Sequence, residues 1–212
     1  MPSAFDPMYC AASVRHHKQR DAMSTPQIHS VRAESSGNVG KPTWRRSADS
    51  IARIAVVAGV LFSGLFAGFL NAVLVLEASL RRFPAPVYTQ VRLVELVHFD
   101  DLATVLLPAA LLATATLVLA TIGRPGPTRW LALAALGLLV ATFIISALVS
   151  VPINTDQQGW SVLAPPSDWA SVRDRWQIAH LVRTTTAVCA FTILVAAAIT
   201  RRPAPRRDQR RR

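Results

Sequence analysis

The chain has 212 residues, of which 51% are hydrophobic, yet it carries a formal net charge of +11. A chain that is both apolar and highly charged must keep the two kinds of residue apart, so the composition favours a membrane protein over a soluble one. Its two cysteines, Cys10 and Cys189, would lie at different depths, and no C-x-x-C motif occurs. This argues against a membrane thiol oxidoreductase.

The first fifty residues, Met1–Ser50, are rich in Ser, His, Arg and Pro and show no apolar period. We expect them to form a disordered tail. The first apolar stretch begins only after this tail and lacks a small-residue cleavage signal. We therefore expect a retained anchor rather than a removable signal peptide.

Four apolar windows follow, each of roughly the 20 residues that a helix needs to cross a bilayer. They cover Ile54–Leu76, Leu102–Ile122, Trp130–Val151 and Ile178–Ile199. The sequence therefore predicts an all-α, polytopic membrane protein with an antiparallel four-helix transmembrane bundle over residues 51–200.

The basic residues orient these predicted spans. The segments Met1–Arg53, Gly123–Arg129 and Arg201–Arg212 hold eight, two and seven Lys or Arg residues, whereas the two other connections together hold five. Because such residues resist translocation, both termini should be cytoplasmic and the protein should be a multi-pass protein of the plasma membrane. The basic tail 201–212 would then attract anionic lipid, and we do not expect nucleic acid as a partner.

Four polar segments would meet at the extracytoplasmic ends of the spans. Glu77 ends the first span, and Glu95–Asp101 leads into the second. Val151–Asn154 follows the third, and Asp168–Thr184 leads into the fourth. Distant parts of the sequence should thus converge at one depth.

The segment before the fourth span carries a polar and aromatic stripe. Its members follow a spacing of four and three residues, which places them on one side of a helix: Trp169, Arg173, Trp176, His180 and Arg183. His180 and Arg183 lie one to two turns inside the span, where an unpaired charge costs at least ~2.5 kcal/mol near the bilayer centre. We expect Arg183 to pair with Glu77 or Asp101, and Asn154 to be a neutral acceptor in a polar pocket. In the alternative, the stripe anchors the helix end in the headgroups and His180 is a packing residue.

A possible metal-binding motif precedes the second span. Glu95 and His98 have the i, i+3 spacing by which a helix can present two ligands to a metal. A complete site would need further carboxylates and a second histidine, so we regard metal binding as the less favoured alternative to an exposed loop pair.

Three motifs resemble a known family. They are Gly64–Gly68 (GLFAG), Val151–Asn154 (VPIN) and the stripe from Trp169 to Arg183. Over about residues 54–200 the sequence resembles the anthrone oxygenase family of small four-span membrane proteins. The resemblance implies the fold of that family and, for some relatives, oxidation of polyketide anthrones to anthraquinones without flavin, haem or metal. No cofactor is therefore expected.

If the protein is such an oxygenase, the chemistry needs a base, an oxyanion partner and a surface for a planar substrate. His180 is the candidate base, since a neutral imidazole suits proton abstraction. The other candidates are Arg183 and Arg173 as oxyanion partners, Trp169 and Trp176 as stacking residues, Asn154 to orient the carbonyl group, and Glu77 and Asp101 as further polar groups of the pocket.

A non-catalytic membrane protein is the alternative. The same polar cluster could lock the outer ends of the helices together or hold a lipid or a small hydrophobic aromatic ligand. A transporter is less favoured because no inverted repeat and no pair of broken helices is evident.

Overall fold

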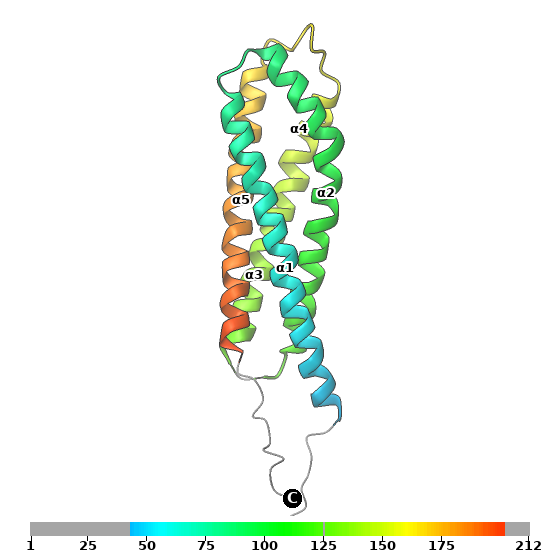
Figure 1. The fold of residues 1–212 in the computed structure, drawn as a ribbon, viewed down its shortest axis with the longest axis vertical. Coiled ribbons are helices and arrows are strands. Elements are labelled where there is room, and N and C mark those ends of the chain that lie inside the picture. The colour runs from blue at the N-terminus through cyan, green and yellow to red at the C-terminus, as the bar shows by residue number, and fades with distance from the viewer. Residues whose placement is uncertain (1–42, 125, 202–212) are drawn as a thin grey trace, which may run out of the picture. The chain divides into compact units, whose positions relative to one another are not determined.

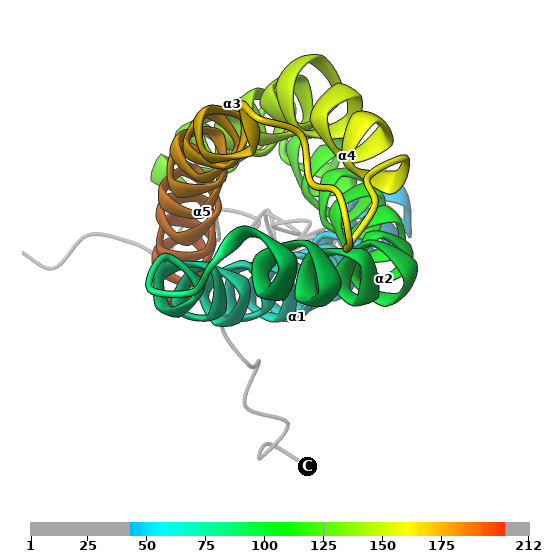
Figure 2. The ribbon, with the colours of Figure 1, turned by 90° about the horizontal axis from the view of Figure 1, so that it is seen from above.

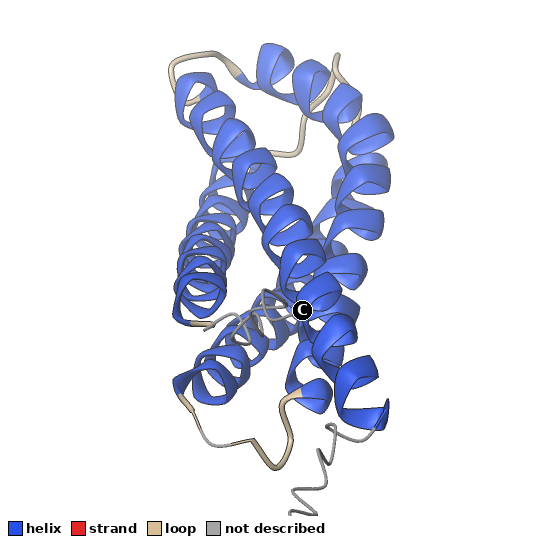
Figure 3. Cartoon of the chain, turned by 60° about the horizontal axis from the view of Figure 1, so that its bottom comes forward, coloured by secondary structure: helices blue, strands red, loops and turns tan. Residues whose placement is uncertain are grey.

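The computed structural model describes residues 43–124 and 126–201, and this part of the chain is helical with no strands (Figures 1 and 3). The elements are α1 (Thr43–Leu80), α2 (Ala85–Ala120), α3 (Pro127–Ile145), the π-helical turn η1 (Ser146–Ser150), α4 (Val151–Gln158) and α5 (Trp169–Thr200). The predicted all-α class is confirmed. Most of the predicted tails lies outside the described residues, although α1 already begins within the stretch expected to be disordered.

Four helical segments of this region are long and apolar enough to cross a membrane. They are Ser47–Leu80, Ala85–Ala120, Pro127–Gln158 and Trp169–Thr200. Each is longer than the apolar window that predicted it. The 36 residues of Ala85–Ala120 extend roughly 54 Å, well beyond the ~30 Å of a hydrocarbon core. The polar residues before the second window therefore belong to a helix and not to a loop.

The third long segment continues through η1 into α4 instead of ending near Val151. Pro152 has no N–H for the carbonyl of Leu148, and its ring would collide with that carbonyl in a regular α-helix. The wider π-helical turn at Ser146–Ser150 absorbs this misfit. The helix thereby carries Asn154 and Gln157 past the proline, and both side chains are buried.

The long helices lie side by side, with α1 next to α2 and α5 next to α3 (Figure 2). A buried apolar cluster draws residues from all four segments: Phe66, Ala67 and Leu70 of α1, Leu106, Leu107 and Ala110 of α2, Leu139 of α3, and Ala187 and Ala190 of α5. The opposite faces expose large apolar side chains such as Ile54, Val57 and Leu112. Such faces suit contact with lipid.

Candidate functional site

Arg92 of α2 is the centre of a buried polar cluster. Its Nε donates to Oε1 of Gln157 at 2.8 Å, its Nη1 to Oε2 of Glu95 at 2.8 Å, and its Nη2 to Oδ1 of Asn154 at 2.7 Å. The guanidinium also lies 3.9 Å from the centre of the Trp176 ring. Only 3% of Arg92 is exposed. Each nitrogen of its planar fork thus has a partner, which is the condition under which a buried arginine is tolerated.

Glu77 of α1 joins the same cluster. Its Oε1 lies 3.6 Å from Nη1 of Arg92, and its Oε2 accepts a hydrogen bond from Nε2 of Gln177 at 2.9 Å. Gln177 in turn accepts from Nε of Arg81 at 2.6 Å. The expected convergence of polar segments from distant parts of the sequence is therefore confirmed, but its cation is Arg92, which was not among the predicted site residues.

Asn154 of α4 links this cluster to Asp100. Its Oδ1 accepts hydrogen bonds from Arg92 and from Nε1 of Trp176, the latter at 2.7 Å. Its Nδ2 lies 3.0 and 3.2 Å from the two carboxylate oxygens of Asp100. The amide is thus oriented by donors on one side and acceptors on the other.

His180 of α5 is buried and held on three sides. Its ring stacks on Trp176 with the centres 4.8 Å apart and the planes at 7°. Nε2 lies 3.0 Å from the carbonyl oxygen of Leu70, and Nδ1 lies 3.3 Å from Nη2 of Arg183. A carbonyl oxygen only accepts and a guanidinium only donates, so Nε2 carries the hydrogen and Nδ1 is the acceptor. His180 is therefore the neutral tautomer whose basic nitrogen faces Arg183.

A cavity of about 430 Å³ lies against these residues, within the ~300–1,000 Å³ of small-molecule sites. Its polar wall comprises Arg92, Glu95, Asp100, Asn154, Trp176, His180 and Arg183. Its apolar wall includes Phe66, Phe69, Phe99 and Phe143. Phe69 and Phe99 meet edge to face, with ring centres 5.7 Å apart. The cavity is thus lined by aromatic side chains together with charged and polar groups.

The predicted pairing of Arg183 with Glu77 or Asp101 is wrong. Glu77 is taken by Arg92, Asp101 is exposed, and Arg183 forms no ion pair with any residue that the structure describes. The Nε of Arg183 is buried and lacks a hydrogen-bond partner within residues 43–124 and 126–201. Arg183 is instead part of the cavity wall, with one hydrogen bond to His180 and a buried Nε without a partner in the part of the chain that the structure describes.

Trp169 and Arg173 lie outside the cavity that the other residues of the stripe line. Trp169 packs on Tyr88 with ring centres 5.6 Å apart, and the guanidinium of Arg173 lies 4.8 Å from the centre of the Trp169 ring. Arg173 also pairs with Asp174 at 3.0 Å. Neither Trp169 nor Arg173 lines the cavity, and neither do Glu77 and Asp101. The structure thus brings Trp176, His180, Arg183 and Asn154 together and leaves these four sites outside.

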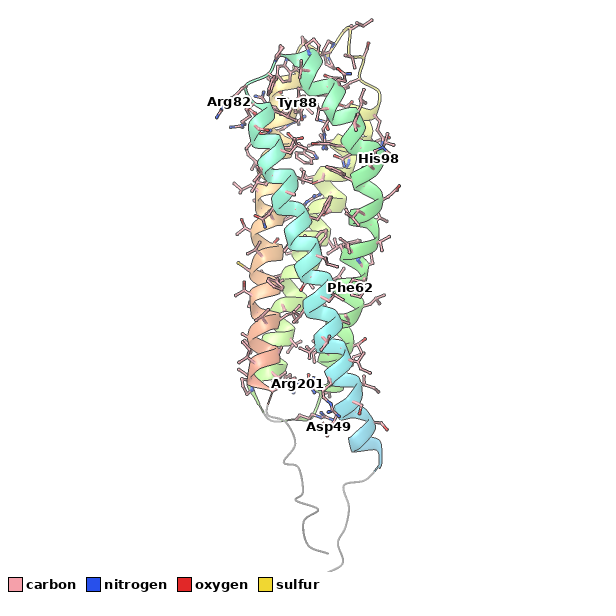
Figure 4. All side chains as sticks on the ribbon, viewed as in Figure 1. Asp49, Phe62, Arg82, Tyr88, His98 and Arg201 are labelled. Atoms are coloured by element: carbon pink, nitrogen blue, oxygen red, sulfur yellow. The ribbon has the colours of Figure 1, made fainter. Side chains whose placement is uncertain are left out.

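Glu95 and His98 do not face a common site. Glu95 is 3% exposed and binds Arg92, whereas His98 is exposed on the outer side of α2 (Figure 4). Among the described residues, no three His, Cys, Asp or Glu side chains are grouped as metal ligands. The expected loop position of Glu95 is also wrong, since the residue is a buried part of a helix.

Sequence reasoning missed Arg92 and Gln157 as cluster residues. Arg92 precedes the second apolar window, Leu102–Ile122, and was expected in a loop. Gln157 follows the third window, Trp130–Val151, and was also expected outside the helices. The signal that could have found Arg92 is its i, i+3 spacing to Glu95, which favours an ion pair on one face of a helix.

Four candidate membrane spans, a buried ionic cluster and an aromatic cavity are the features of a multi-pass membrane protein with an internal cavity. Residues 99–193 match the model of the anthrone oxygenase family, which confirms the resemblance over the segment that holds Val151–Asn154 and the stripe, while Gly64–Gly68 precedes it. The matched segment contains Asp100, Asn154, Trp176, His180 and Arg183, whereas Arg92 and both buried glutamates precede it. No curated protein and no solved structure matches the chain.

Proposed function

We propose that the protein binds a planar, phenolic or anthrone-like molecule in the cavity and oxidises it with O₂, without a bound cofactor. The observation that carries the proposal is the unpartnered Nε of Arg183 in the wall of an aromatic cavity, within the segment similar to anthrone oxygenases. A buried donor without a partner costs about 1–3 kcal/mol. A phenolate oxygen placed against Arg183 recovers this cost, which favours an anionic aromatic ligand.

The remaining walls suit a flat ring system. Four phenylalanine side chains line the cavity, and the stacked Trp176 and His180 rings form a further planar surface. Aromatic surfaces of this kind favour offset or edge contacts with a bound ring. Arg183 would fix the oxygen substituent, while Asn154 and Asp100 lie along the same polar wall.

In the proposed reaction His180 takes a proton from the activated CH₂ group of the substrate through Nδ1. This nitrogen becomes free when Arg183 turns its N–H groups from His180 to the substrate oxyanion. The electron-rich carbanion then reduces O₂ by forming a C–O bond, and the resulting peroxide takes the proton held by His180 to give a hydroperoxide. In total one CH₂ group and one O₂ give one C=O group and one H₂O.

A lipid-borne substrate can reach this cavity from the side. The lining residues Thr104 and Pro108 of α2 and Phe143, Ala147 and Val151 of the third helical segment are all exposed. Exposed lining residues on two neighbouring helices support an opening between them toward the acyl chains. We propose that this part of the protein lies at the extracytoplasmic end of the spans, with both termini cytoplasmic, as the distribution of basic residues favours. Lateral access lets a hydrophobic substrate arrive through lipid.

The experiment measures ligand binding and O₂ uptake on protein purified in lipid nanodiscs. A hydroxylated anthrone should quench tryptophan fluorescence and should be consumed with one O₂ per molecule, faster than without protein. Arg183→Gln should slow turnover about 100-fold, as loss of an oxyanion donor does. Arg173→Gln removes an arginine from the same helix outside the cavity and should leave the rate unchanged.

His180→Gln tests the proposed base. The variant should fold, because glutamine can still donate to the Leu70 carbonyl. It should bind the anthrone but not turn it over. Binding of the anthrone without O₂ uptake by the wild type would instead identify a non-catalytic ligand-binding protein. Absence of binding contradicts both functions for this cavity.

A further inference from the structure

Two buried carboxyl groups contact one nitrogen of Arg92. Oε2 of Glu95 lies 2.8 Å and Oε1 of Glu77 3.6 Å from Nη1. The two glutamates are 3% and 1% exposed. Among the described residues, no second cation forms an ion pair with either of them. If both were ionised, the group would hold one uncompensated negative charge away from water, which is costly.

The oxygen atoms of the two glutamates also indicate that the pair is not fully ionised. Oε1 of Glu77 and Oε1 of Glu95 are buried, and no donor of the described chain hydrogen-bonds to either. The two carboxyl groups nevertheless lie against the same nitrogen of Arg92, so they are close neighbours. Two ionised carboxylates repel each other and can only accept hydrogen bonds, whereas one proton relieves the repulsion and supplies a donor.

We propose that Glu77 and Glu95 together bind one proton at neutral pH and that Glu95 presents it to the cavity. A proton shared by two adjacent carboxyl groups leaves one negative charge, which matches the single positive charge of Arg92. The surrounding titratable and charged groups are Tyr88, Arg92 and Asp100 on α2, Arg81 after α1, and His180 and Arg183 on α5, whereas α4 contributes the neutral Asn154 and Gln157.

The two glutamates have different positions relative to the cavity. Glu95 lines it, whereas Glu77 lies behind Arg92 and does not. Glu95 is thus the member of the pair that can exchange a proton with a bound molecule. This role, but not the presence of the proton, rests on the proposed function.

In the proposed oxidation His180 takes the second C–H proton of the hydroperoxide, the O–O bond breaks, and hydroxide leaves as the C=O bond forms. The hydroxide needs a proton to become water. The Glu95 carboxyl group donates it. The pair then regains one of the two protons that the CH₂ carbon has lost, so no proton is gained or lost overall.

Infrared spectroscopy of the purified protein in nanodiscs tests the proton directly, without substrate. The wild type at neutral pH should show the C=O stretch of one protonated carboxyl group. Glu77→Gln and Glu95→Gln should each abolish this band, because one carboxylate then faces one guanidinium and needs no proton. Asp101→Asn, which changes an exposed carboxyl group of the same helix, should leave the band intact.

A wild-type spectrum without the band, or a band that survives both substitutions, overturns the inference. If a glutamine variant cannot be purified, titration of the wild type suffices, since the band should disappear as the pH is raised. Its failure to do so also overturns the proposal.

Turnover tests the role of Glu95. Glu95→Gln should bind the anthrone with unchanged affinity but oxidise it at least tenfold more slowly. An unchanged rate removes the donor role. A wild type that shows the band without binding the anthrone contradicts the proposed function and leaves the proton site standing.

Discussion

Arg92 on α2 and Arg183 on α5 both line the cavity, but their surroundings differ. Arg92 donates to three side chains from two helices and stacks on Trp176. Arg183 has one hydrogen bond to His180 and a buried Nε without a partner in the described chain. The two arginines thus differ in what they bind: Arg92 ties α2 to α4, whereas Arg183 keeps one buried donor without a partner in the described chain.

The largest effect should come from Arg92→Gln. It leaves the Glu77 and Glu95 carboxyl groups without their cation and removes donors from Gln157 and Asn154. Breaking a buried pair in this way costs about 3–5 kcal/mol. Thermal unfolding in detergent should show a large fall in Tm. Arg183→Gln, the matched substitution of the other cavity-lining arginine, should cost less than about 1 kcal/mol because few bonds are lost. Equal losses in the two variants would contradict the distinction.

Asn154→Leu should have the next largest effect, because this residue joins Arg92 to Trp176 and Asp100. Leucine is close in size but leaves the N–H groups of Arg92 and Trp176 and the Asp100 carboxylate without their partner. We expect a loss of about 2 kcal/mol, since each unmade buried hydrogen bond costs about 1–3 kcal/mol and cavity water restores part of it. The same unfolding assay measures this loss. A stability equal to that of the wild type would show that Asn154 does not connect the cluster.

Ala147→Trp should slow ligand access to the cavity and leave the stability of the Arg92 cluster unchanged. Ala147 lies in η1 and is an exposed lining residue of the cavity. A bulky ring there should obstruct the opening between α2 and the third segment without touching Arg92. We expect association of the anthrone to slow about tenfold, as obstructed access acts on the on-rate, with Tm unchanged. Stopped-flow quenching of tryptophan fluorescence measures the rate. An unchanged rate would place the route of access elsewhere.

Much of the fold and part of the site could be predicted from sequence. The length of an apolar window indicates which part of a helix can lie in lipid. The four spans and the convergence of the polar segments could therefore be predicted. The stripe correctly grouped Trp176, His180 and Arg183 on one side of a helix. Their partners could not be predicted in the same way, because pairing depends on how each helix is rotated by packing.

Arg92 shows this limit most clearly. Hydropathy places it before the second window, yet the helix starts at Ala85 and turns Arg92 inward. The extension of the third segment to Gln158 was hidden for a related reason. Pro152 and the polar residues after it are typical of a helix end, and the π-helical turn that accommodates the proline has no simple sequence signal.

The smallest effect on stability should come from substitutions at the apolar contact between α1 and α5. They provide a reference against which the losses in the polar cluster can be compared. A Cβ atom at Gly64 would lie 2.9 Å from Cε2 of Phe191, whereas one at Gly68 would meet nothing within 4 Å. Gly64→Ala should therefore cost about 1 kcal/mol by crowding the ring. Gly68→Ala should leave Tm unchanged or slightly raised, since alanine favours helix. Comparable Tm values for the two variants would mean that Phe191 moves aside freely and that the close approach at Gly64 does not limit the packing of α5 against α1.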